Sequence, residues 1–276
     1  MIEQFLIGMD HPIVKHHRSR GQGLLPASSY IDLLFQLFRE QGYDAAQLEL
    51  CGLTVYLPLL IGNEEKAHLW IQLEKEEEHV WNIRGECEKH THTASIGSYK
   101  ERKLLMTARM LLKEPAAFEE RLDIARIRLD AEQSIHMEAY YDACRMYDLV
   151  HDGIMLCEGT RFESVDSDCC LQVTLGSEAL PNAAEFMFHP ALIEGGIVGS
   201  GALIPQGTGN EEELFVPLHF ESFRASRTLD NECWVRISEP IGNKPKLHLF
   251  TLEFFDSSGS KIAELLHFWS MSQKRE

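Results

Sequence analysis

Three residues near the N-terminus combine a titratable side chain with two residues that shape the backbone. His17, Gly21 and Pro26 form the pattern H-x-x-x-G-x-x-x-x-P, which leads directly into an apolar stretch. A histidine just before a helix can act as a base near neutral pH. The helix N-terminus offers unpaired N–H groups that stabilise negative charge, and glycine lets the backbone pass close to a ligand. The pattern therefore indicates proton transfer beside a helix end.

A second candidate stretch begins about 170 residues later, at another histidine followed by proline. It reads HPALIEGGIV from His189, and its acidic residue is Glu194. Several glycines follow, and because glycine is a poor helix former, a helix here is expected to lie buried against a close neighbour. His189 itself is interpreted as structural, because buried polar groups usually have a partner.

Two central helices are expected to carry these residues. The first runs from Pro26 to about Gly42, with apolar residues at helical spacing and the proline in its first turn. The second runs from Pro190 to about Leu203, before Pro205. A further helix is expected over residues 135–150.

Short β-rich segments surround these helices in both halves of the chain. Strands are expected at residues 69–73, 80–85, 103–112, 170–175, 233–237, 247–255 and 262–270. Residues 255–261 have the composition of a hairpin turn. Each half thus offers one apolar helix and a set of antiparallel strands, which is typical of a hot-dog domain. The predicted fold is an α+β double hot-dog, with two sheets that each wrap a helix and are fused as a pseudo-dimer. Its halves are predicted at residues 1–113 and 135–276, joined by a charged connection at 114–134.

Both histidine stretches resemble those of polyketide synthase dehydratase domains. Residues 10–33, with His17, Gly21 and Pro26, resemble the start of the family, and residues 255–264 resemble its last hairpin. The segment from His189 is similar to the family's H-P-x-x-x-D-x-x-x-Q stretch. The likeness covers nearly the whole chain. It implies His17 as the catalytic base, Gly21, Pro26 and Ala27 as substrate-binding residues, and the N–H of Ala27 as the donor to a thioester oxygen.

The chain departs from the family at the second stretch. Glu194 stands where the family has its catalytic aspartate, and Val198 stands where a glutamine or histidine holds that aspartate. The family's Y-G-P stretch would fall at residues 158–160, which read Glu-Gly-Thr. The acidic side chain is therefore one methylene longer than the family's aspartate and lacks that polar neighbour, whereas the histidine base is retained. A misplacement of about 1 Å can lower a rate on the order of 100-fold.

These departures favour a reaction that does not expel water. Dehydration requires a base for the α-proton and an acid for the leaving hydroxyl. Moving a double bond from α,β to β,γ requires one group that takes a γ-proton and returns a proton to the α-carbon. The chain therefore most resembles the enoyl-isomerase domains of trans-acyltransferase polyketide synthases, with His17 as the single acid/base.

Three alternatives stay open. Related fatty-acid hot-dog dehydratases use a glutamate, so a dehydratase with Glu194 as its acid is one alternative. A pyran-forming domain and a non-catalytic structural domain are the others. The resemblance implies an acyl carrier protein and neighbouring synthase domains as partners, and it leaves a homodimer open.

Composition excludes several other classes of protein. The 276 residues are 44% hydrophobic and 25% charged, as in soluble globular proteins, and the net charge of −17 argues against nucleic acid as a ligand. No apolar run reaches the roughly 20 residues of a membrane helix, and the N-terminus lacks a signal-peptide pattern. No membrane association and a cytoplasmic location are therefore expected.

The cysteines do not form a recognisable metal or disulfide pattern. There are seven, without a C-x-x-C motif, and the adjacent Cys169 and Cys170 are interpreted as reduced residues in or near a strand. No metal and no organic cofactor are expected. The prosthetic group implied by the resemblance is the phosphopantetheine arm of the carrier protein.

Overall fold

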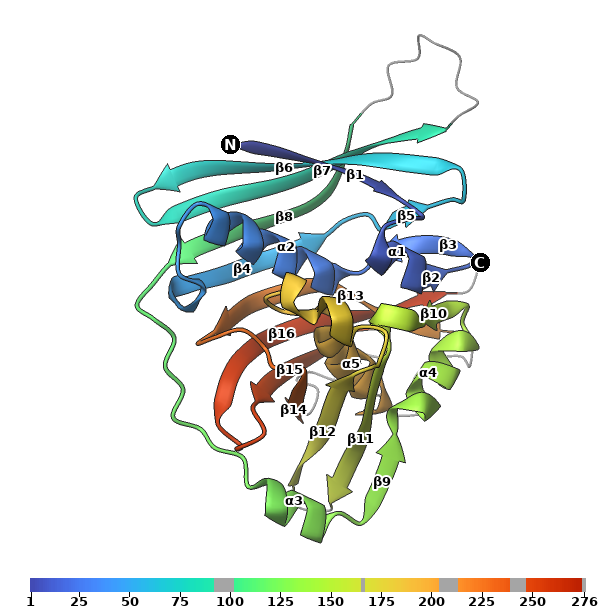
Figure 1. The fold of residues 1–276 in the computed structure, drawn as a ribbon, viewed down its shortest axis with the longest axis vertical. Helices are drawn as coiled ribbons and strands as arrows, with labels where there is room; N and C mark the ends of the chain where they lie inside the picture. The colour runs from blue at the N-terminus through green and yellow to red at the C-terminus, as the bar shows by residue number, and fades with distance from the viewer. Residues whose placement is uncertain (92–101, 165–166, 204–212, 239–246, 275–276) are drawn as a thin grey trace.

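Antiparallel sheet dominates the computed structural model of the chain, which describes residues 1–91, 102–164, 167–203, 213–238 and 247–274 (Figure 1). One sheet has twelve strands in the order β1-β6-β7-β8-β4-β13-β16-β15-β14-β12-β11-β9, and a second has the order β10-β2-β3-β5. Within the described residues, the helices are too short or too polar to cross a lipid bilayer.

The large sheet takes strands from both halves of the chain. Those of the first half are β1 (Ile2–Gly8), β4 (Leu48–Val55), β6 (Glu65–Glu77), β7 (Val80–Thr91) and β8 (Lys103–Leu112). Those of the second half are β9 (Gln133–His136), β11 (Cys157–Ser164), β12 (Ser167–Leu175), β13 (Glu213–Ala225), β14 (Glu232–Ser238), β15 (Leu247–Phe255) and β16 (Lys261–Lys274). These strands include all seven that the sequence predicts.

The two hot-dog sheets are continuous with one another. Strand β4 of the first half pairs antiparallel with β13 of the second, with Phe220 opposite Leu53. The pairing covers the backbone N–H and C=O groups that two free sheet edges would otherwise expose. The double hot-dog prediction is confirmed, with the addition that its two sheets join edge to edge.

One helix packs against the strands of each half. Helix α2 (Ala27–Glu40) contacts β4 and β13, whereas α5 (Pro190–Ser200) contacts β11, β12, β14 and β15, and the two helices also pack against each other. Glycines allow the close approach of α5 to the sheet, because a Cβ atom on Gly196 or Gly199 would lie 2.9 Å from a leucine methyl group. The expectation that this helix is buried is confirmed.

The third predicted helix is shorter than residues 135–150. Helix α4 covers Met137–Arg145 alone, because its flanks form strands: β9 ends at His136, and β10 covers Leu149–His151. Strand β9 pairs with β11, and β10 pairs with β2 (His17–Ser19). Pairing with distant strands overrides the helical pattern at both ends.

Smaller elements complete the fold. They are α1 (Pro12–His16), α3 (Ile124–Asp130), β3 (Gln22–Leu25), β5 (Leu59–Ile61) and the 3₁₀ turns η1 (Ala45–Gln47), η2 (Gly153–Met155), η3 (Leu180–Glu185) and η4 (Gly201–Leu203). Pro205, expected to end the second helix, lies outside the described residues. The boundaries of the two halves at 113 and 135 stay predictions.

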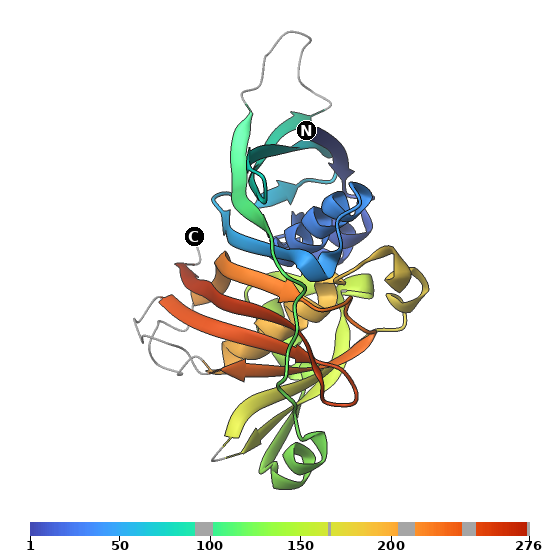
Figure 2. The same cartoon turned by 90° about the vertical axis from the view of Figure 1, so that its left-hand side faces the viewer.

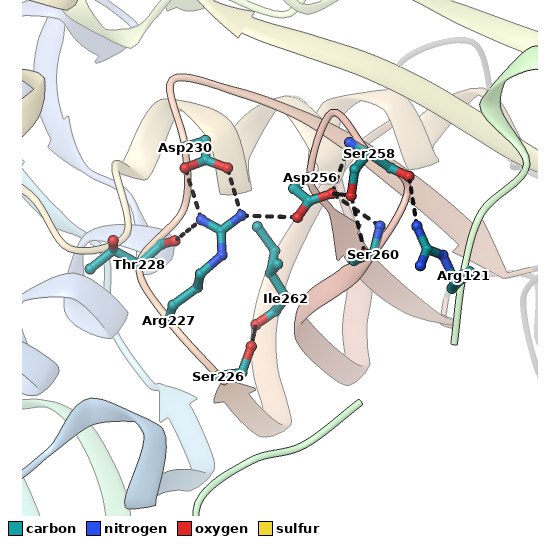
Figure 3. Close-up of polar contacts among 9 residues, drawn as sticks. All are labelled: Arg121, Ser226, Arg227, Thr228, Asp230, Asp256, Ser258, Ser260 and Ile262. Carbon is teal, nitrogen blue, oxygen red and sulfur yellow. Dashed lines mark hydrogen bonds and ion pairs between the residues drawn. The ribbon is translucent and has the colours of Figure 1, made fainter. Parts of the chain in front are cut away.

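The segment between the halves runs along the strands of the second half, as Figure 2 shows in green. It meets the hairpin turn between β15 and β16, where the N–H of Leu122 donates to the carbonyl of Gly259 at 2.7 Å. Asp256 holds this turn by accepting from the N–H groups of Ser258 and Ser260, and it also meets Arg227 (Figure 3). The hairpin expected at residues 255–261 is therefore present.

Candidate active site

His17 is fixed by a short hairpin that precedes α2. The turn between β2 and β3 consists of Arg20 and Gly21, which both have positive φ angles (50° and 74°), as a tight hairpin requires. The hairpin brings the carbonyl of Leu24 to 2.9 Å from His17 Nδ1. Because a carbonyl can only accept, Nδ1 carries the proton and Nε2 presents the lone pair of the neutral ring.

The other residues of the first motif shape this local structure. Gly21 lies exposed at the turn, where its positive φ explains the glycine, and a contact with a ligand stays a prediction. Pro26 precedes α2 with φ −70°, and Ala27 is the first residue of that helix. The N–H of Ala27 therefore has no acceptor within its own helix, and its predicted role at a thioester oxygen stays a prediction.

Glu194 enters the same buried region from α5. The Ser28 hydroxyl donates to Glu194 Oε2 at 2.9 Å, and this bond joins α2 to α5 across the two halves. His151 Nε2 lies 4.0 Å from Oε1, an ion-pair distance that is too long for a hydrogen bond. Val198, half-buried one turn further along α5, offers no polar group. Ser28 and His151 thus supply the polar neighbours that the sequence appeared to lack.

His151 completes a cluster with His17 and Glu194. It lies directly opposite His17 in the pairing of β10 with β2, and the two ring centroids are 4.7 Å apart. Exposure is 2% for His17, 0% for His151 and 5% for Glu194, so all three side chains lie in the interior. No sequence pattern indicates His151 or Ser28, although Ser28 lies only two residues after Pro26 in the first motif.

Residues 158–160, the predicted counterpart of the family's Y-G-P stretch, do not contribute their acidic residue to this cluster. Residues 158–160 lie in β11, and Glu158 is exposed. The segment of the second half that meets His17 is β10, which carries His151. His189 is not part of the cluster contacts: its Nδ1 atom accepts from the N–H of Ala191 at 3.2 Å and so caps α5.

Electrostatics separate the roles of the two acid–base groups that the sequence identified. Burial, followed by the nearby charge of His151, lowers the pKa of His17 to about 4, so its ring is neutral near pH 7. Burial alone would raise the pKa of Glu194, but His151, His17 and the Ser28 hydroxyl outweigh it, so the pKa is lowered. The cluster therefore pairs a neutral imidazole with an ionised carboxylate.

The cluster also has the composition of a metal site. His17, His151 and Glu194 each present one ligand atom, and these atoms lie within 4.8 Å of one another. Catalytic zinc commonly has three such protein ligands. The sequence predicted no ligand set, because the three residues are far apart in the chain.

Comparison with known proteins gives consistent matches along the chain. Residues 2–86 match the family described as polyketide synthase dehydratase domain, and residues 145–263 match the one described as polyketide synthase dehydratase N-terminal domain. Polyketide synthase PksL of Bacillus subtilis (strain 168) is 37% identical over 269 residues, which are 97% of this chain. Polyketide synthase PksM of the same strain is 36% identical over 267 residues, or 96%. The chain spans only 6% of the length of each of these relatives.

A solved structure matches the chain from end to end. It is described as a monomeric dehydratase domain from a trans AT polyketide synthase split module, and it is 36% identical in sequence. The TM-score is 0.92, and the match covers 98% of both chains.

Proposed function

Because the chain belongs to the polyketide synthase dehydratase family, we propose that it is an enoyl isomerase of a trans-acyltransferase polyketide synthase. Its substrate would be a 2-enoyl chain in thioester linkage to the phosphopantetheine of an acyl carrier protein. Its product would be the 3-enoyl thioester, with the double bond moved from α,β to β,γ. Neighbouring synthase domains would deliver and receive the carrier protein.

The reaction begins with removal of a γ-proton. His17 Nε2 would take this proton, and the C–H electrons would form the new β,γ double bond. The original double bond then shifts its electrons toward the thioester, which gives a dienolate. The N–H of Ala27 at the start of α2 would donate to the thioester oxygen, where the negative charge collects. Protonation of the α-carbon completes the shift without loss of any atom.

One observation carries this proposal: a buried His17 with its Nδ1 atom hydrogen-bonded lies in one cluster with Glu194. The Nδ1 atom of His17 is held by the Leu24 carbonyl, and Nε2 is buried without a hydrogen-bond partner among the described residues. That is the form a base requires. The lowered pKa of Glu194 removes the proton that a departing hydroxyl would need. The arrangement suits proton removal better than expulsion of water.

A dehydratase is the second candidate, and the position of Glu194 favours it. Ser28 and His151 hold the carboxylate in the same cluster as His17, as a base and an acid flanking one substrate would require. The structurally similar protein at 36% identity is itself described as a dehydratase domain. In this reading, Glu194 would bind a proton before each turnover and give it to the β-hydroxyl.

Incubation with two carrier-protein thioesters, followed by mass spectrometry, tests the proposal. With a 2-enoyl thioester in heavy water, an isomerase introduces deuterium at the α and γ carbons. With a 3-hydroxyacyl thioester, a dehydratase gives a product that is lighter by one water. Ready loss of water without γ-deuteration would reject the isomerase. A cyclic product would indicate a pyran-forming domain, and inertness toward both substrates would indicate a structural one.

The same assay tests whether a cofactor takes part. We propose that neither a metal nor an organic cofactor is needed, because His17 supplies the base and a helix end supplies the anion-stabilising donor. Activity should therefore survive dialysis against a chelator. Loss of activity on chelation, with recovery on addition of zinc, would instead assign His17, His151 and Glu194 as metal ligands.

A further inference from the structure

The second imidazole of the cluster, His151, is buried without a hydrogen bond. Both ring nitrogens of His151 are buried, and neither has a hydrogen-bond partner within the described part of the chain. Leaving a buried polar group without a partner costs about 1–3 kcal/mol. By contrast, the neighbouring His16 directs its Nδ1 to Asp152 at 2.8 Å, and His189 uses its Nδ1 to cap α5. The unpaired ring nitrogens of His151 are therefore available to a ligand that enters the cluster.

The position of His151 is fixed relative to His17. Strand β10 of the second half adds to β2 of the first, and the register places the two histidines opposite each other. Directly opposed residues on paired strands have side chains on the same face of the sheet. Tyr141 packs against His151, with ring centroids 5.2 Å apart, and its hydroxyl accepts from the N–H of Cys157. The two imidazoles therefore share one face with a fixed spacing.

The third member of the cluster, Glu194, lies beside His151 as well as His17. One carboxylate oxygen of Glu194 is occupied by the Ser28 hydroxyl, and the other is the one near His151 Nε2. Glu194 therefore places its second carboxylate oxygen beside His151. His17, in contrast, directs its Nδ1 proton to a neutral carbonyl. The two histidines are thus arranged for opposite tasks.

We infer that His151 is a second catalytic acid–base residue, which gives the α-carbon its proton while His17 removes the γ-proton. This inference rests on the proposed isomerase function. His17 Nε2 gains the proton from C4, the electrons pass through C3 to C2, and C2 takes the proton from His151. His17 then carries the extra proton, which it loses to solvent, and His151 takes a new proton from solvent, which restores the starting state. Glu194 stays ionised throughout, so protons and charge balance.

Deuterium at C4 distinguishes one base from two. The probe is a 2-enoyl carrier-protein thioester with two deuterium atoms at C4, incubated in ordinary water. If one histidine serves both steps, part of the abstracted deuterium returns to C2 of the product. If His151 supplies the second proton, C2 receives hydrogen. We therefore expect the wild-type protein to form a product with almost no deuterium at C2.

The variant His151→Gln makes the test stricter. Loss of one general acid typically lowers turnover by about 100- to 10,000-fold, and the remaining activity must use His17 for both steps, so deuterium should now appear at C2. His16→Gln is the matched control, because His16 lies next to His17 but pairs with Asp152 on a half-buried surface. His16→Gln should change neither the rate of isomerisation nor the deuterium content at C2 of the product.

Three results would overturn the inference. If wild-type product carries C4-derived deuterium at C2, His17 serves both steps. If His151→Gln keeps the wild-type rate and label, His151 takes no part, although the isomerase function stands. If the wild type does not isomerise the probe at all, the proposed function fails and this inference fails with it. Because the wild-type label is informative by itself, the test does not depend on the variant folding.

Discussion

Asp32 on α2 accepts a hydrogen bond from the backbone N–H of Phe188 at 2.9 Å, just before α5 begins. The same carboxylate oxygen accepts from the N–H of Met187 at 2.8 Å. Burial raises the pKa of Asp32 to about 6, although both backbone N–H groups and Gln36 oppose this effect. Asp32 therefore joins the helix that follows His17 to the start of the helix that carries Glu194.

Replacing Asp32 by alanine should weaken the protein and its site together. Each of the two backbone N–H groups would lose its acceptor in the interior, at a cost of about 1–3 kcal/mol apiece. Urea unfolding measures the loss. Asp123→Ala is the control, because Asp123 only caps the exposed helix α3 through the N–H of Arg126, for which about 0.5–2 kcal/mol is typical. An equal or smaller loss for Asp32→Ala would contradict the role assigned to it.

The pH dependence should reflect the burial of His17. Its pKa is lowered from 6.5 to about 4 in the folded protein, so the unfolded chain binds this proton more readily. The resulting stability is fully present above pH 6.5 and is lost as the pH falls toward 4, by up to about 3 kcal/mol. Unfolding free energies measured between pH 4 and 7 check the sign.

The pH dependence of activity should also reflect the burial of His17. Because His17 stays neutral well below pH 6.5, kcat/KM should show no loss from protonation of this base until near pH 4, or until the protein unfolds. The pH–rate profile and a parallel unfolding curve separate the two causes. An acidic limb centred near 6.5 in fully folded protein would show that His17 is not held neutral.

Replacing His17 by alanine should remove the base for either catalytic function. The expected loss in turnover is about 100- to 10,000-fold, the usual contribution of general acid–base catalysis. Circular dichroism should show a folded protein, because the cavity lies at the edge of a hairpin. His16→Ala should stay active. A folded His17→Ala protein with near-normal turnover would refute the assignment of the base.

Glu194→Gln should distinguish the two candidate reactions. The amide keeps the size of the side chain and can still accept from Ser28, but it has no carboxylic proton to give. Dehydration of a 3-hydroxyacyl thioester should stop, whereas isomerisation of a 2-enoyl thioester should be reduced far less than by His17→Ala. Glu158→Gln, on the exposed face of β11, should leave both unchanged. A variant that loses isomerisation as completely as His17→Ala would contradict this division of roles.

The hairpin turn that holds the connection between the halves should tolerate no side chain at Gly259. Its φ is +81°, and a Cβ atom would lie 2.2 Å from the backbone oxygen of Leu122. Gly259→Ala should therefore destabilise the protein by more than about 1 kcal/mol. Gly201→Ala is the control, because Gly201 has a helical φ of −57° and open space around it. At such a site, alanine typically raises the free energy of unfolding by about 0.4–1 kcal/mol. Thermal melting of both variants checks the contrast.

The sequence by itself determined the local elements and the identity of the main side chains. Helical spacing after Pro26 predicts α2, and the strands from β6 to β8 follow from their β-rich composition. These features depend on neighbours within a few residues, so periodicity and turn chemistry suffice to find them. The two histidine stretches likewise identify His17 and Glu194 as residues to consider together.

Tertiary structure alone decided what surrounds those residues. The chain shows no local signal that Leu149 and Val150 would leave the predicted helix and form β10 with His151. Nor does it show that β10 would pair with β2, where His151 lies opposite His17, 134 residues earlier in the chain. Nor does the sequence indicate that Ser28 would replace the missing partner of Glu194 from another helix. Strand register and helix packing between distant segments fix these contacts. Because the pKa of a buried group depends on such contacts, the electrostatic state of the cluster also follows only from the folded chain.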